Sequence, residues 1–355
     1  MRRWAIVLVG FSPWPGLAVD FSIDLPAHGG LTLGPDAADL WDLPAPAEPP
    51  RTRGPVLGRN SAEPTRPAPP PPPRLPKGSA KDPHFPELPC LRNNVRFWVR
   101  VYRDLGDDEG LLHDRDDPGR VFAAVRLTQG RGEEETAAVK RLYAQKLESA
   151  AAKLQRGAAL DSRDMQVVQV FAPGERTPGH LRASIPRLRL QTGLKGRFRA
   201  GVQRSLTHLP AIRRILHSHQ LPLGIAHLPH VESSFQPAAR SKVGAAGLWQ
   251  LMPDTMRSLL GRGSVHLRTH PEVSTRAAAK LLRQNYARTG SWPLALTAYN
   301  HGLGGVLAGM NQTGSRDLCE LISGYKSPSF KFASMNFYAQ FLAARKVANA
   351  AYANL

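Results

Sequence analysis

A proline-rich stretch divides the chain and limits where a folded domain can form. Between Pro44 and Pro89 the sequence consists largely of proline, alanine, arginine and glycine, and Pro69–Pro73 are five consecutive prolines. Such a segment cannot bury enough apolar surface to offset the entropy that folding removes, and polyproline is stiff. We therefore predict a disordered, Pro-rich spacer over residues 19–89. A recognition motif for a proline-binding partner is the alternative interpretation.

The first residues are typical of an export signal. A basic start precedes an eight-residue, mostly apolar run from Trp4 to Phe11, and small residues end at Ala18. We expect cleavage after Ala18, which makes residues 1–18 a signal peptide. The apolar run is too short to span a bilayer, so we predict no stable membrane span. A short buried helix or a misassigned start is the alternative, although two nearby prolines disfavour a helix.

The charge balance points to a polyanionic partner. The 355 residues include 47 basic and 28 acidic side chains, a formal net charge of +19. Nucleic acid, an acidic membrane face and an anionic wall polymer all fit this excess. Export removes most nucleic-acid explanations, so we predict no nucleic-acid partner. A coding bias toward alanine, arginine, proline and glycine explains the charge equally well.

The chain has two cysteines, Cys90 and Cys319. In an oxidising compartment they can pair and join the start of the folded region to its end. The sequence gives no distance between them, so two independent buried thiols are the interpretation that we favour.

Residues 90–193 predict a helical N-terminal subdomain without a chemical motif. The expected elements are a helix over Val95–Tyr102 capped by Asn93 or Asn94, a short strand or buried turn over Val121–Leu127, a helix over Glu133–Arg156 and a weak strand over Met165–Phe171. The helix over Glu133–Arg156 is the clearest, because it has an acidic first turn, a basic end and a following glycine.

Residues 194–355 carry dense helical signals and almost no strand signal. The expected helices are Arg197–Leu206, one beginning at Pro210, Leu223–Ser233, Thr275–Thr289, Leu294–Tyr299 and Phe337–Tyr352. Short helices joined by tight loops indicate a mainly α protein.

Glu232 is an acid in an apolar setting. The run Leu223–Val231 before it is mostly apolar, and Phe235 follows closely. A carboxyl group placed there should have a raised pKa through desolvation, which suits a general acid near neutral pH. Taken alone, however, Glu232 is better explained as a capping or ion-pairing residue.

Three separated motifs change that interpretation. They are ESSF at 232–235, GAAGLWQLMP at 244–253 with Ser241 just before it, and AYNHG at 298–302. In this order and spacing they resemble the lysozyme-like catalytic domain of the lytic transglycosylases, closest to the D-type membrane-bound murein enzymes. The resemblance extends over roughly Leu91–Leu355 and implies a lysozyme-like fold for residues 194–355.

The resemblance implies that Glu232 is the single catalytic acid/base. The family cleaves the bond between N-acetylmuramic acid and N-acetylglucosamine with one acid rather than the usual pair. The muramic C6 hydroxyl attacks C1, so a 1,6-anhydromuramoyl end forms without water or a cofactor. A hydrolytic muramidase and a non-catalytic wall-binding or assembly protein are the alternatives.

The same resemblance assigns substrate-binding residues. Ser241 and Gln250 match polar positions beside the sugar, Met252 matches a groove position, and Tyr299 matches a tyrosine whose hydroxyl approaches the glutamate. Each has a plainer explanation: Ser241 as a cap, Gln250 as a member of a buried network, Met252 as packing and Tyr299 as a core aromatic. Asn300 either binds substrate or holds the turn that presents Tyr299.

Two further expectations concern histidines and partners. The family commonly has a small residue where His301 stands, and we expect a solvent-facing side chain there. His227 and His230 lie near Glu232 in the wrong order for a helical zinc motif, so we predict no metal. The expected partners are peptidoglycan glycan strands and wall-synthesis or secretion-machinery proteins, and the expected location is the periplasm or cell envelope.

Overall fold

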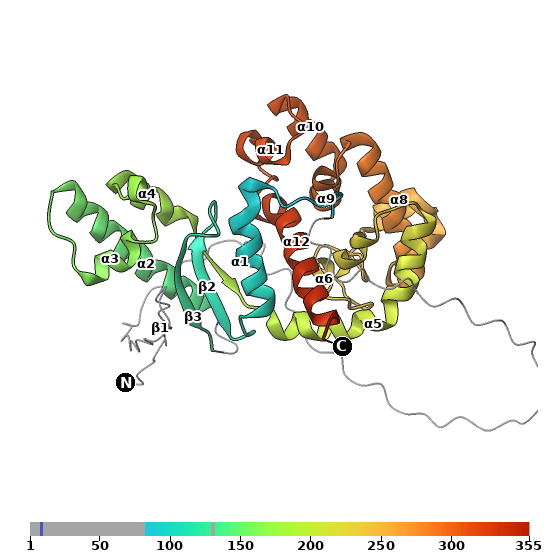
Figure 1. The fold of residues 1–355 in the computed structure, drawn as a ribbon, viewed down its shortest axis with the longest axis horizontal. Coiled ribbons are helices and arrows are strands. Elements are labelled where there is room, and N and C mark those ends of the chain that lie inside the picture. The colour runs from blue at the N-terminus through green and yellow to red at the C-terminus, as the bar shows by residue number, and fades with distance from the viewer. Residues whose placement is uncertain (1–7, 10–81, 129–131, 355) are drawn as a thin grey trace, which may run out of the picture.

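The computed structural model describes residues 8–9, 82–128 and 132–354. The predicted signal peptide and most of the predicted spacer therefore lie outside the described residues, apart from strand β1 (Leu8–Val9). The fold is mainly helical, as predicted. Figure 1 shows a sheet with helices α2 to α4 at one end of the molecule and the remaining helices at the other.

The N-terminal end combines a sheet with helices. The sheet is antiparallel in the order β1-β3-β2-β4, where β2 is Glu109–Asp114, β3 is Val121–Arg126 and β4 is Leu188–Thr192. The helices beside it are α2 (Gly132–Gln155), α3 (Ser162–Val168) and α4 (Pro178–Ser184), with 3₁₀ turns at Pro173–Glu175 and Ile185–Arg187. This part has its own apolar core, in which Leu147, Val167 and Leu181 are fully buried.

The N-terminal end confirms two of the predicted elements and contradicts two other predictions. The helix over Glu133–Arg156 is confirmed by α2, and the strand alternative for Val121–Leu127 is confirmed by β3. The strand predicted over Met165–Phe171 is wrong, because Asp161 caps α3 by accepting hydrogen bonds from two backbone amides of its first turn. The asparagine caps are also wrong, since α1 already begins at Arg92.

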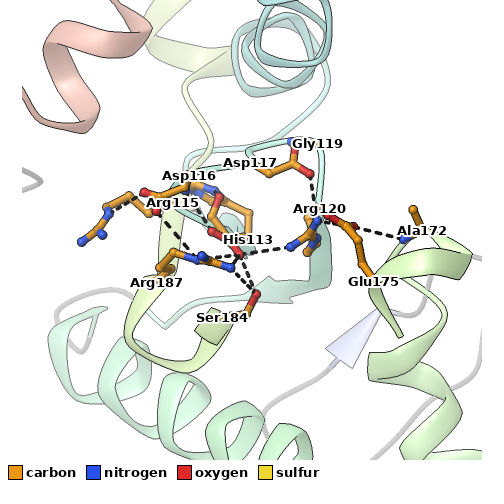
Figure 2. A network of polar contacts seen from close by, with 11 residues as sticks. His113, Arg115, Asp116, Asp117, Gly119, Arg120, Ala172, Glu175, Ser184 and Arg187 are labelled. Carbon is orange, nitrogen blue, oxygen red and sulfur yellow. Dashed lines mark hydrogen bonds and ion pairs between the residues drawn. The ribbon is translucent and has the colours of Figure 1, made fainter. Parts of the chain in front are cut away.

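A buried network of charges fixes the sheet to the turns around it (Figure 2). Asp114 at the end of β2 accepts hydrogen bonds from Ser184 at 2.6 Å and from Arg187 at 3.1 Å. Arg120 lies 3.5 Å from the same carboxylate and 2.7 Å from Glu175. Because Asp114 is fully buried, these partners are what makes its charge tolerable.

The other end is built from helices and 3₁₀ turns. The α-helices are α1 (Arg92–Arg103), α5 (Lys195–Ser218), α6 (Leu228–Glu232), α7 (Pro253–Leu260), α8 (Pro271–Thr289), α9 (Trp292–His301), α10 (Leu303–Thr313), α11 (Leu318–Gly324) and α12 (Phe332–Tyr352). The 3₁₀ turns are Pro89–Leu91, Leu223–His227 and Arg262–Thr269. One apolar core joins them.

Helix α1 belongs to this larger core although it directly precedes strands β2 and β3 in sequence. It lies beside α12 in Figure 1, and the Asn336 side-chain oxygen accepts hydrogen bonds from Asn94 at 2.9 Å and from Trp98 at 3.3 Å. Phe85, within the predicted spacer, is also buried against Phe341 with ring centroids 5.0 Å apart. The folded part therefore begins before Cys90.

Two further expectations are corrected. Arg197–Leu206 and the segment from Pro210 are one helix, α5, with Pro210 inside it. Burial of Leu209, Ile212 and Leu216 along that helix offsets the hydrogen bond that proline cannot donate. The favoured interpretation of two separate thiols is wrong, because Cys90 and Cys319 form a disulfide with a Cα–Cα distance of 5.8 Å.

Candidate active site

Glu232 is the last residue of α6 and lies among apolar side chains. Leu228 and Phe235, on either side of it in sequence, are fully buried, whereas Glu232 itself is half-buried and can be reached from solvent. Desolvation raises the pKa of its carboxyl group from an ordinary value of 4.5 to about 8. At neutral pH the group therefore holds its proton, as the sequence predicts for a general acid.

The backbone after Glu232 is strained and firmly held. Ser234 and Phe235 both have left-handed φ angles, +50° and +57°, which are unfavourable for residues with a Cβ atom. Arg204 donates two hydrogen bonds, at 2.8 and 3.2 Å, to the Ser234 carbonyl oxygen. Gly201 faces the same carbonyl, and a Cβ at that glycine would lie 2.8 Å from the oxygen. This packing fixes where the glutamate side chain begins.

The loop between α6 and α7 carries three of the predicted residues, of which Ser241 comes first. Ser241 closes a turn, in which its hydroxyl oxygen accepts a hydrogen bond from the Ala245 amide at 2.9 Å. It is therefore a turn residue rather than the helix cap considered as its alternative. Ser233 donates a 2.8 Å hydrogen bond to the Leu248 carbonyl oxygen, so the loop is attached directly to the residue after Glu232.

Gln250 and Met252 lie further along the same loop. Gln250 has a φ of +45°, and its side-chain amide donates hydrogen bonds to the carbonyl oxygens of Gly247 at 3.0 Å and Ala239 at 3.4 Å. It thus stabilises the loop, and a contact with sugar stays a prediction. Met252 is 40% exposed, which suits a groove position better than core packing.

Tyr299 connects α9 to the same loop. Its hydroxyl donates a 2.7 Å hydrogen bond to the Trp249 carbonyl oxygen. Burial raises its pKa well above the ordinary value, and the nearby negative charge of Glu232 raises it further. Trp249 is fully buried and donates a 2.8 Å hydrogen bond to the Thr275 hydroxyl on α8. The tyrosine therefore lies within electrostatic reach of Glu232 on a well-supported backbone.

The two residues after Tyr299 face α12. Asn300 is exposed, and its side-chain oxygen accepts a 3.0 Å hydrogen bond from Ser334, which favours the interpretation that it holds the turn. The solvent-facing position predicted for His301 is wrong. Its ring packs edge-on against Phe330 at 4.9 Å and Tyr325 at 6.1 Å, and burial lowers its pKa.

The sequence did not identify Tyr102 as a neighbour of the site. This buried residue of α1 lies with its hydroxyl 3.5 Å from the Gln340 side-chain oxygen on α12. Its pKa is raised by burial and, secondly, by the charge of Glu232. The helical spacing of Val95–Tyr102 predicts a core position, and nothing in a periodic pattern shows which carboxylate a core tyrosine approaches.

The buried histidines near Glu232 form a packing cluster. His230 lies with Nε2 2.9 Å from the Tyr352 hydroxyl, and its ring stacks on Phe198 at 4.9 Å. Burial lowers the pKa of His227 to about 3 and that of His230 well below its usual value, so both are neutral. Among the described residues, no group of three or more metal-binding side chains could hold an ion.

Comparison with known proteins agrees with this geometry. Residues 212–322 match the family model of the Transglycosylase SLT domain. The chain is 36% identical over 99 residues to membrane-bound lytic murein transglycosylase D of Escherichia coli K12, covering 27% of this chain and 22% of that protein. It is 41% identical over 81 residues to a transglycosylase of Enterobacteria phage PRD1, covering 23% of this chain and 29% of that protein.

The match to the Transglycosylase SLT domain thus covers residues 212–322 and agrees with the family that the motifs resemble. The chain spans less than a third of the length of these two relatives. Among solved structures, the 70 kDa soluble lytic transglycosylase of Escherichia coli matches with a TM-score of 0.35 and 18% identity. The match covers 63% of this chain and 44% of that one. Within the described part of the chain, no helix is long and apolar enough to cross a membrane.

Proposed function

We propose that the chain is a peptidoglycan lytic transglycosylase in which Glu232 serves both proton transfers. The observation that carries this proposal is a solvent-reachable carboxyl group whose pKa is raised to about 8 by its apolar surroundings. The family match supplies the substrate class, since the domain family and the curated relatives are transglycosylases.

The proposed reaction returns the enzyme to its starting state. Protonated Glu232 gives its proton to the glycosidic oxygen as the bond from muramic C1 to that oxygen breaks. The resulting carboxylate then removes the proton of the muramic C6 hydroxyl, while that oxygen bonds to C1. A 1,6-anhydromuramoyl end and a free N-acetylglucosamine hydroxyl result, water is not consumed, and Glu232 is protonated again. A single acid/base suffices because the attacking C6 hydroxyl and the C1 atom that it attacks belong to the same sugar.

The remaining residues have supporting roles in this proposal. Tyr299 lies close enough to Glu232 for the carboxylate charge to raise the tyrosine pKa. Its hydroxyl dipole can therefore stabilise positive charge at C1. Ser241, Gln250 and Met252 are carried on the loop attached to Ser233, which suits contacts with the sugar at the cleavage site. Asn300 fixes the end of α9 through Ser334.

We also propose that the protein works outside the cytoplasm, in the periplasm or cell envelope. The Cys90–Cys319 disulfide supports this location, because disulfides persist in oxidising compartments. The N-terminal signal predicted from the sequence is consistent with it, as is the similarity to a membrane-bound murein enzyme.

Mass spectrometry of digested sacculi tests the reaction. The purified full chain should release muropeptides with anhydro ends, Glu232→Gln should release none, and Glu272→Gln should match the wild type. Glu272 is a suitable control because it is a glutamate in a surface ion pair with Arg276. Reducing muramic ends, one water heavier, would indicate a hydrolytic muramidase. Binding without release of muropeptides would indicate a non-catalytic wall protein.

A further inference from the structure

A pocket lies at the start of α9. It has a volume of about 290 Å³ and is lined by His84, His219, Gln220, Leu221, Pro222, Arg283, Tyr286 and Trp292. We call it the Tyr286 pocket. Trp292 begins α9 whereas Tyr299 lies near its end, so the pocket and Tyr299 are separated by roughly 10 Å along the helix axis.

One wall of the Tyr286 pocket is an aromatic platform. The ring of Tyr286 stacks on Trp292 with centroids 4.5 Å apart and planes 21° apart, yet Tyr286 stays 40% exposed. Trp292 is buried and packs in turn against Phe85 at 6.0 Å. The exposed tyrosine face is thus rigid before any ligand arrives, which is what stacking against the apolar face of a sugar ring requires.

Basic side chains lie beside this platform. Arg283 lies one turn before Tyr286 on α8 and is exposed, and none of the described residues that line the pocket is acidic. The pKa of His219 is lowered by burial and then by the positive charges of Arg283, Lys280 and Arg276, all on α8. The nearby acid Asp82 accepts a hydrogen bond from Arg345 at 2.9 Å, which offsets its charge.

The aromatic platform and the basic side chains beside it together suit one kind of ligand. A sugar polymer without charge would use Tyr286 but gain nothing from the row of cations on α8. A phosphate polymer without sugar or base rings would use the cations but leave the aromatic face without a role. A glycan strand with carboxylate-bearing peptides matches both, because its sugars stack and its carboxylates pair with a guanidinium.

We propose that the Tyr286 pocket binds peptidoglycan at a point distant from the bond that is cleaved, with a sugar ring on Tyr286 and a stem-peptide carboxylate on Arg283. The identity of this ligand rests on the proposed function. The pocket would keep the protein on the glycan strand between cleavage events and leave the chemistry at Glu232 unchanged.

Co-sedimentation with sacculi tests this pocket separately from catalysis. All proteins are full-length and carry Glu232→Gln, so that digestion cannot obscure binding. We expect Tyr286→Ala and Arg283→Gln each to weaken binding by about tenfold, whereas Tyr286→Phe and Arg288→Gln leave it unchanged. Arg288 is the matched control, since it is an exposed arginine of α8 that does not line the pocket. Equal melting temperatures of the variants verify that they are folded.

A second arm uses sacculi whose stem-peptide carboxylates have been converted to neutral amides. The parent protein should bind them about tenfold more weakly than intact sacculi, and Arg283→Gln should cause no further loss. Unchanged binding by Tyr286→Ala, or equal binding to both kinds of sacculi, would overturn the proposal. If wild-type protein released no muropeptides while the pocket variants still lost binding, only the proposed function would fail.

Discussion

The hydroxyl of Tyr299 donates a 2.7 Å hydrogen bond to the backbone carbonyl oxygen of Trp249, three residues before Met252 in the loop between α6 and α7. This bond joins the end of α9 to the loop that carries Ser241 and Gln250. It also keeps the phenol within range of the Glu232 charge, which helps to raise the tyrosine pKa. Tyr299 thus both anchors the loop and lies within range of the Glu232 charge.

Removing the Tyr299 hydroxyl should both destabilise the protein and slow cleavage. Tyr299→Phe leaves a buried carbonyl oxygen without its partner, a loss of about 1–3 kcal/mol of stability. We expect sacculus cleavage to fall by about 10- to 100-fold, because the dipole beside the reacting carbon is lost as well. Rates of muropeptide release and a urea unfolding curve measure the two effects. Tyr325→Phe, a change at a half-buried tyrosine that packs on His301, is the control and should alter neither.

The pKa of Glu232 predicts how activity depends on pH. The first proton transfer needs the protonated acid, so cleavage should decline as the pH rises through about 8. A profile that declined near pH 4.5 instead would mean that the carboxyl group is not desolvated during catalysis. Glu272→Gln should reproduce the wild-type profile.

The same shift predicts a change in stability. Between pH 4.5 and about 8 the folded protein keeps a proton that the unfolded chain releases, so stability falls as the pH rises through this interval. Glu232→Gln has no such proton and should melt above the wild type at pH 8.5, but close to it at pH 4. Each kcal/mol gained corresponds to about 2–4 °C in melting temperature. Calorimetry at both values checks the sign.

The elements that the sequence predicted well are those with local signals. Helix α2 has acidic residues in its first turn and a basic residue, Lys153, in its last, and α9 ends where Gly302 takes a φ of +88°. The apolar run before Glu232 likewise predicted a desolvated acid, in agreement with its raised pKa. Each of these features depends on residues close together in the chain.

The features that were missed depend on tertiary contacts. Strand β2 was not predicted because it is buried on both faces, so its residues do not alternate between apolar and polar. Pro210 was expected to begin a helix, yet packing keeps α5 continuous through it. The position of Tyr102 near Glu232 requires α1 to pack on α12, more than two hundred residues later. Spacing within a segment carries no such information.

The disulfide should contribute strongly to stability. Cys90 and Cys319 close a loop with a sequence separation of 229, and linking them restricts the unfolded chain. We expect Cys319→Ser to lower the free energy of unfolding by about 2–5 kcal/mol. Reductant should shift the wild type by a similar amount and leave the Cys90→Ser/Cys319→Ser double variant unchanged. A wild-type protein indifferent to reductant would contradict the disulfide and weaken the argument for export.

The carboxylate of Asp114 should be more important to the fold than the exposed carboxylate of Asp116. Its side chain is 1% exposed and lies beside Arg120 and Arg187. Asp114→Asn removes the charge that compensates two partly buried guanidinium groups, which should cost about 3–5 kcal/mol. Asp116→Asn is the matched control, because that carboxylate is 49% exposed and its pair with Arg115 is a surface contact.

The two aspartates differ in burial rather than in distance from an arginine. Asp116 lies 3.1 Å from Arg115, as close as Asp114 lies to Arg187. If ion-pair distance alone determined stability, the two substitutions would destabilise the protein equally in chemical unfolding. If desolvation determines it, Asp114→Asn should lower the denaturation midpoint clearly while Asp116→Asn changes the free energy by less than about 1 kcal/mol. Sacculus cleavage at a temperature where both variants are folded should then be nearly unchanged, because Asp114 acts on the sheet and not on Glu232.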